Sequence, residues 1–164
     1  MQGGYFSYGL LAALAIALVF AAFTDLRRRQ IDNWLNAAIA LGAPLFWLAS
    51  GLSLGGVGIQ LAVAAAALAV LAGLFAMGWM GGGDVKLLTA LALWIEPTGF
   101  MRLLVIMALL GGLLTVVVGG WHIARRNKHK IAVPYGIAIA AAGLWTLASQ
   151  YLPAFLAGAA ALST

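Results

Sequence analysis

Residues 5–24 read YFSYGLLAALAIALVFAAFT, a run of predominantly apolar residues without a single charge. About 20 such residues are enough for one helix to cross the hydrocarbon core of a bilayer. The rest of the chain has the same character, because 65% of its 164 residues are hydrophobic and 8% are charged. A soluble domain carries about a quarter charged residues. The composition therefore excludes a soluble globular domain and a disordered chain, and it predicts a polytopic membrane protein.

Five further apolar runs follow the first, separated by glycine, proline or charged residues. They predict an all-α membrane protein with six transmembrane helices in a single domain, residues 1–164. The expected spans are about 5–24, 34–54, 57–80, 85–95, 100–121 and 133–152. No basic segment precedes the first run, which we interpret as a retained span and not as a cleaved signal peptide.

The basic residues predict the orientation of the chain. Eight of the nine lie in the connections after the first, third and fifth spans, and only Arg102 lies on the other side. The eight are Arg27, Arg28, Arg29, Lys86, Arg125, Arg126, Lys128 and Lys130. Cytoplasmic loops carry such an excess of Lys and Arg, so we expect both termini outside the cytoplasm. The net charge of +5 then reflects membrane topology and anionic lipid, not nucleic-acid binding.

Several kinds of chemistry are missing from the sequence. The chain has no cysteine, which excludes disulfides, thiolate metal sites and cysteine nucleophiles. It has no nucleotide-binding glycine motif and no HExxH motif. His122 and His129 have no further ligand at a suitable spacing. We expect no cofactor and no metal. Four tryptophans near span ends, Trp34, Trp79, Trp94 and Trp121, are expected in the interfacial aromatic belt.

Two of the four acidic residues are candidates for catalysis. Asp25 ends the first span, where the helix dipole disfavours an anion by about 0.3–1 kcal/mol. Asp84 follows three glycines, where an N-cap would be the structural interpretation. The helix from Asp84 to Glu96 would be only about 20 Å long, however, against a hydrocarbon core of about 30 Å. Asp84 is then expected below the cytoplasmic surface, where a carboxylate must be protonated, paired or hydrated.

A pair of carboxyls at one membrane face can hydrolyse a peptide bond, with one carboxylate activating water and one carboxyl polarising the carbonyl. Asp32 and Glu96 have ordinary interpretations: Asp32 is expected to cap the second helix or to pair with the arginines, and Glu96 to lie in an outer loop. Two other functions remain open. A small proton-coupled transporter or channel would use Asp25 and Asp84 as a proton relay, and a structural subunit of a secretion machine would need neither.

Three motifs resemble those of the type IV prepilin peptidases. Asp25 is followed by Arg27-x-Arg29-x-Ile31-x-Asn33, which resembles the first motif of that family. Residues 81–88, GGGDVKLL, look like its Gly-x-Gly-Asp motif with the following lysine, Lys86. Residues 133–136, VPYG, are similar to its third signature. The resemblance covers nearly the whole chain in order and in topology.

The resemblance implies a GxGD-type aspartic membrane protease in the bacterial inner membrane. Such an enzyme cleaves the short basic leader of prepilins and pseudopilins at the cytoplasmic face, near the pilus-assembly machinery. Asp25 and Asp84 match the two catalytic aspartates. Gly81, Gly83, Lys86, Asn33 and Pro134 match the supporting motif. The short chain resembles the minimal branch that serves Tad (Flp-type) pili.

The sequence departs from the family pattern in two places. Ile31-Asp32-Asn33 stands where the family usually has Ile-Pro-Asn. The large members that also N-methylate pilins carry paired cysteines, and this chain has none, so the resemblance does not extend to methylation. Lys86 has two possible roles: it anchors the short fourth helix at the interface, or it tunes the ionisation of the aspartates.

Overall fold

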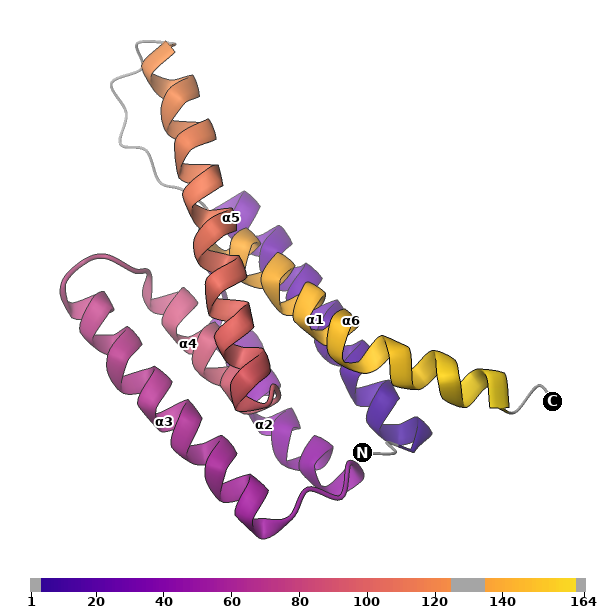
Figure 1. Ribbon diagram of the computed structural model, residues 1–164. Helices are drawn as coiled ribbons and strands as arrows, with labels where there is room; N and C mark the ends of the chain where they lie inside the picture. Colours follow the sequence, from indigo (N-terminus) through magenta and orange to yellow (C-terminus); the bar gives the residue numbers. More distant parts are fainter. Residues whose placement is uncertain (1–3, 125–134, 162–164) are drawn as a thin grey trace.

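The chain forms six α-helices in a computed structural model that describes residues 4–124 and 135–161. Within these two ranges all regular structure is helical, which confirms the all-α fold class. The helices are α1 (Tyr5–Arg28), α2 (Asn33–Ala49), α3 (Leu54–Ala76), α4 (Gly82–Ala92), α5 (Pro97–Ala124) and α6 (Tyr135–Ala161), as Figure 1 shows.

The helices differ in whether they can cross a membrane. Four are long and apolar enough to do so, namely α1, α3, α5 and α6. The apolar helix α2 has 17 residues, and α4 has only 11. At 1.5 Å per residue α4 is about 16 Å long, well short of the hydrocarbon core of about 30 Å. The chain is therefore a multi-pass membrane protein, whereas six separate crossings and their orientation stay predictions.

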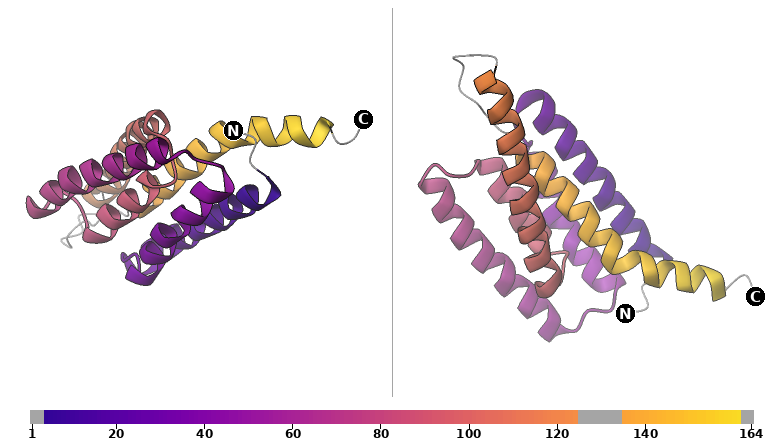
Figure 2. Two further views of the ribbon diagram at one scale, coloured as in Figure 1. Left: turned by 90° about the horizontal axis from the view of Figure 1, so that it is seen from below. Right: turned by 45° about the horizontal axis from the view of Figure 1, so that its top comes forward.

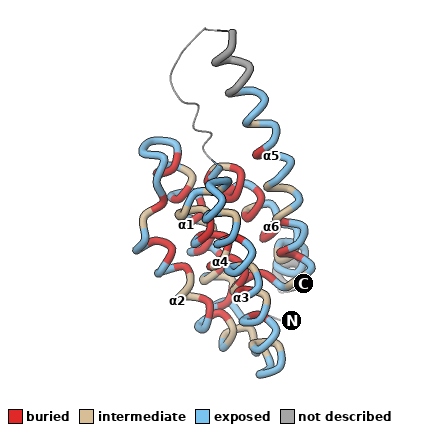
Figure 3. The backbone as a smooth tube through the Cα atoms, turned by 90° about the vertical axis from the view of Figure 1, so that its left-hand side faces the viewer, coloured by how far each residue is buried: buried red, intermediate tan, exposed pale blue. Residues whose placement is uncertain are grey.

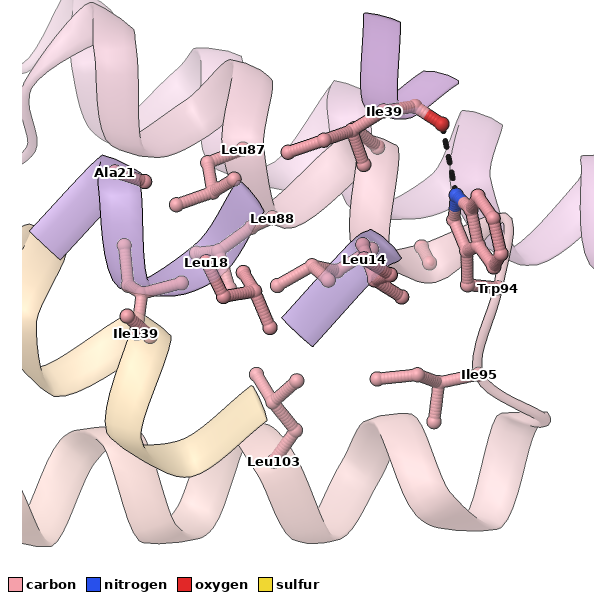
Figure 4. Close-up of a cluster of buried hydrophobic side chains, with 14 of the residues drawn as sticks. Leu14, Leu18, Ala21, Ile39, Leu87, Leu88, Trp94, Ile95, Leu103 and Ile139 are labelled. Carbon is pink, nitrogen blue, oxygen red and sulfur yellow. Dashed lines mark hydrogen bonds between the residues drawn. The ribbon is translucent and has the colours of Figure 1, made fainter. Parts of the chain in front are cut away.

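The short helix α4 forms the centre of the bundle. Leu87, Leu88 and Leu91 on this helix are completely buried, and α4 contacts α2, α3, α5 and α6. Figure 4 shows Leu87 and Leu88 among side chains from α1, α2 and α6, while Figure 3 shows that the outward faces of the long helices are exposed. A helix surrounded by protein on all sides needs apolar residues all round, which explains the run of apolar residues after Lys86; Thr89, the polar residue within it, donates its hydroxyl to Val85 O at 2.8 Å.

Side chains from neighbouring helices hold the far end of α4 in place. The last carbonyls of a helix have no partner within it. Trp47 Nε1 on α2 donates to Leu93 O at 2.8 Å, and Gln60 Nε2 on α3 donates to Ile95 O at 2.7 Å. Both acceptors lie just beyond the last residue of α4. These hydrogen bonds fix where the short helix ends along the bundle axis.

Trp94 corrects one expectation from the sequence. It was expected in the aromatic belt, but it is only 4% exposed, and its ring stacks on Phe46 with the centroids 5.2 Å apart. Its Nε1 donates to Ile39 O at 2.8 Å, the dashed line in Figure 4. Trp34 and Trp79 are exposed, as a belt position requires. The side chain of Trp121 lies outside the described part.

The helix ends that carry the candidate residues meet at one end of the bundle. The end of α1 and the starts of α2, α4 and α6 lie together there, away from the N-terminus (Figure 1). α6 passes Pro153 and continues to Ala161, beyond the expected end of the last span near residue 152. Phe155 in this last part packs on Tyr8 of α1, with the ring centroids 5.1 Å apart, and Figure 2 shows the end of α6 extending beyond the other helices.

Candidate active site

A polar cavity of about 430 Å³ opens where α1, α2 and α4 meet. Its walls are Asp25, residues 29–33 and residues 81–84. The structure thus brings Asp25 and Asp84 to one cavity although 58 positions separate them in the sequence. Asn33, Gly81 and Gly83 of the supporting motif line the same cavity. Pro134 and the basic stretch 125–130 lie outside the described residues.

Asp25 is buried in the last turn of α1, with 6% of its surface exposed. Its Oδ2 has no hydrogen-bond partner among the described residues. The dipole of α1 disfavours an anion here, whereas the backbone amides of Gly136 and Ile137 in the first turn of α6 interact favourably with the carboxylate. The charge of Arg29 acts in the same direction. Asp25 is therefore held between the end of one helix and the start of another.

Gly136 is a site residue that the sequence analysis left out of its candidate set. A Cβ built at this position would lie 2.7 Å from Asp25 Cγ and 2.7 Å from Asp25 Oδ2. Only glycine lets the α6 backbone approach the carboxylate so closely. The signal was present in the sequence, because Gly136 belongs to the third motif, residues 133–136.

Asp84 is the third residue of α4. It is therefore not the N-cap of this helix, which was the structural interpretation of its position in the sequence. The helix begins at Gly82, and Gly81 is the capping residue. Asp84 lies outside the four long apolar helices. Burial and the negative charge of Asp25 raise the pKa of its carboxyl to about 6, and the Gly81 backbone opposes the rise. Asp84 therefore keeps its proton to a higher pH than an ordinary aspartate does.

The glycines before Asp84 are needed for close packing. A Cβ on Gly81 would lie 2.9 Å from Asp84 Oδ2. A Cβ on Gly83 would lie 3.3 Å from Ile31 Cβ, against the segment that leads into α2. The Gly-x-Gly-Asp motif therefore lets α4 start directly against the loop that forms the opposite wall of the cavity.

Two side-chain hydrogen bonds connect the starts of α2 and α4. Lys86 Nζ donates to Asn33 Oδ1 at 2.8 Å, and Asn36 Nδ2 donates to Gly83 O at 3.5 Å. Lys86 is exposed, and its partner Asn33 is the first residue of α2. Neither expected role of Lys86, as an interfacial anchor or as a residue that tunes the aspartates, included this partner. Asn36 is 4% exposed and was missed, although a lone amide three residues after Asn33 in an apolar run was a usable signal.

The loop between α1 and α2 holds two further features of the cavity wall. Arg29 ends α1 with φ 53°, a left-handed conformation that is uncommon for a non-glycine residue and is often found at functional sites. Asp32 occupies the N-cap position of α2, as expected, but its side chain makes no capping hydrogen bond. Asp32 is therefore at the expected position, but the expected capping hydrogen bond of its side chain is absent.

Glu96 is exposed and precedes α5, beyond the far end of α4 from the cavity. Its Oε1 accepts a hydrogen bond from Thr98 Oγ1 at 3.3 Å. In the part of the chain that the structure describes, no three His, Cys, Asp or Glu side chains lie close enough together to hold a metal ion.

Residues 12–116 match the model of the type IV leader peptidase family. The matched region contains α2, α3, α4 and every residue that lines the polar cavity. No curated protein and no solved structure matches the chain.

Proposed function

Because the chain belongs to the type IV leader peptidase family and is thus a membrane protease, we propose that it is an aspartic endopeptidase with Asp25 and Asp84 as its catalytic residues. The observation that carries this proposal is their shared cavity. Aspartic proteolysis needs two carboxyls that hold one proton between them. Burial and the charge of Asp25 both raise the pKa of Asp84, to about 6, which favours retention of that proton.

The reaction follows from general acid–base chemistry at this pair. The ionised carboxylate takes a proton from a water molecule, whose oxygen attacks the scissile carbonyl carbon. The protonated carboxyl donates its hydrogen bond to the carbonyl oxygen and stabilises the charge that develops there. When the tetrahedral intermediate collapses, the C–N bond breaks and the leaving amine takes up the proton that the first carboxylate had accepted from water, which restores the pair. The cavity, which polar groups line, gives water access to both carboxyls.

We further propose the substrate class and the side of cleavage. The substrates of a leader peptidase are prepilins and pseudopilins, and we take Flp-type precursors of Tad pili as the candidate substrates. The excess of basic residues on the side of Asp25 and Asp84 favours cleavage at the cytoplasmic face of a bacterial inner membrane. Pilus-assembly proteins and membrane lipid are then the neighbours of this enzyme.

The experiment that tests the proposal is a cleavage assay with a purified Flp-type prepilin in detergent. Asp25→Asn and Asp84→Asn each remove one member of the acid–base pair, and each is expected to lower the cleavage rate at least about 100-fold, the usual contribution of such a group. Conversion of precursor to mature pilin is followed on a gel. Membrane level and melting temperature of each variant show that it folds.

Glu96→Gln is the matched control, because it neutralises an acidic residue far from the cavity and should leave the rate unchanged. Near-normal cleavage by either aspartate variant would contradict the two-aspartate mechanism. Proton flux that depends on Asp25 and Asp84 in proteoliposomes, without cleavage, would instead favour the transporter that the sequence left open.

A further inference from the structure

The cavity wall carries a third carboxylate, Asp32, that the acid–base pair does not use. Asp32 is half-buried, and its side chain makes no capping hydrogen bond to α2. Its neighbours on both sides are fixed. Ile31 is 7% exposed beneath Gly83, and Asn33 accepts the hydrogen bond from Lys86. The carboxylate is therefore held at the wall of the cavity without a role in forming the helix.

The charge of the cavity is unbalanced. Three aspartates line it, Asp25, Asp32 and Asp84, and Arg29 is the cationic residue in the same lining. Arg29 acts on Asp25. Asp25 Oδ2, in a residue that is 6% exposed, also lacks a hydrogen-bond partner in the described part. A ligand that enters this cavity meets excess negative charge and free acceptor atoms.

We propose that Asp32 is a specificity-determining residue that binds the ammonium or guanidinium group of a substrate lysine or arginine near the scissile bond. This inference rests on the proposed function and concerns the same site. A carboxylate on the cavity wall pairs with a cationic side chain while Asp25 and Asp84 act on the adjacent peptide bond. The pairing fixes the register of the substrate and lowers KM, and it takes no part in bond breaking.

Asp32→Asn is a suitable variant because it removes the charge and little else. Asparagine is as good an N-cap as aspartate, and no capping hydrogen bond is lost. With a prepilin that has a basic leader, KM is expected to rise at least about tenfold while kcat stays within about twofold, as for the loss of one charge pair at a partly buried contact. With a precursor whose leader lysines and arginines are all glutamine, wild type and Asp32→Asn should have the same KM.

A charge exchange completes the test. Asp32→Lys should cleave the basic precursor poorly, and it should regain cleavage with one precursor in which a single leader lysine or arginine is glutamate. The position of that residue identifies the partner of Asp32. Glu96→Gln serves as the control acid and should have the same KM as wild type for each of these precursors.

Three results would overturn the inference. Asp32→Asn could leave the KM for the basic precursor unchanged, it could impair both precursors equally, or no single-glutamate precursor could restore cleavage by Asp32→Lys. In each of these cases wild type still cleaves the basic precursor, so the proposed peptidase function stands. If wild type cleaves no precursor at all, the proposed function fails and the role of Asp32 fails with it.

Discussion

At the scale of single residues, Asp25 and Asp84 are held in different ways. Asp25 is almost completely buried against the start of α6, whereas Asp84 lies behind glycines that leave space on its cavity side. The two carboxyls nevertheless interact, because the charge of Asp25 contributes to the raised pKa of Asp84. Their chemistry therefore belongs to the pair and cannot be divided between them.

The first consequence is a pH dependence. The proposed reaction needs one proton in the pair, and the pKa of Asp84 is raised to about 6. Above this pH the retained proton is lost, so cleavage is expected to fall as pH rises, approaching about tenfold per unit. Asp25→Asn removes the nearby negative charge and should lower the pKa of Asp84, measured by NMR of ¹³C-labelled aspartate. Glu96→Gln should not move it; an unchanged value in Asp25→Asn would mean that the two carboxyls do not interact.

Gly136 permits a second prediction at the residue scale. Gly136→Ala places a methyl group 2.7 Å from Asp25 Cγ, so α6 or the carboxylate must shift. Because misplacement of a catalytic group by about 1 Å costs about 100-fold, cleavage is expected to fall by roughly that factor. Gly9→Ala in α1 is the control, since nothing lies within 4 Å of its Cβ. Equal activity of the two variants would show that the contact between α6 and Asp25 has no catalytic importance.

At the scale of elements, the contact between Lys86 and Asn33 connects the start of α4 to the start of α2. Lys86→Met is expected to reduce stability in detergent by about 1 kcal/mol, the usual net value of one hydrogen bond, while Lys86→Arg retains a donor. In Asn33→Ala, Lys86→Met should add almost nothing further, because the bond is already lost. Thermal unfolding of wild type, Lys86→Met, Asn33→Ala and the double variant measures this coupling.

The same variants distinguish the two roles considered for Lys86. If the lysine only connects helices, the pH profile of cleavage is the same in wild type and Lys86→Met. If it tunes the aspartates, loss of the cation raises a carboxyl pKa and moves the profile upward. A shift of about one pH unit without a change in stability would contradict the structural role that the hydrogen bond to Asn33 favours.

The elements also show what the sequence could predict. The six helices and their order were predictable because long apolar runs admit few other structures in a membrane. Asp25 and Asp84 were identified as candidates because a carboxylate at the end of an apolar span, or at the start of a helix too short to cross the membrane, is energetically unfavourable without a partner, a proton or water. The contact of Gly136 with Asp25, the buried Trp94 and the hydrogen bond from Gln60 to Ile95 were not predictable. Apolar helices have no clear polar face, so the sequence does not indicate which sides meet.

At the scale of the whole molecule, the placement of the candidate site depends on one short helix. α4 has 11 residues, and Trp47 and Gln60 hold the chain just beyond its far end. Its start lies beside the last turn of α3, because a Cβ on Gly82 would lie 3.3 Å from Phe75 Cε2. Asp84 therefore lies at the end of the bundle where α1 and α3 end, and it is the far end of α4 that stops short of a full crossing. A protein-lined cavity supplies water and polar groups to the carboxyl there, which lipid cannot. The short helix and the polar cavity at its start are thus parts of one arrangement.

The orientation of this arrangement decides whether the proposed substrate can reach it. Gln30, in the exposed loop beside Asp25, and Leu54, 91% exposed at the start of α3, lie at opposite ends of α2. The chain has no cysteine, so Gln30→Cys and Leu54→Cys each report one position without background. Because the sequence predicts eight of the nine basic residues on the side of Gln30, a membrane-impermeant maleimide added to spheroplasts should label position 54 and leave position 30 unlabelled until the membrane is permeabilised. The reverse pattern would place Asp25 and Asp84 on the outer face, where a leader on the cytoplasmic side of its pilin could not reach them, and cleavage at the cytoplasmic face would then be wrong.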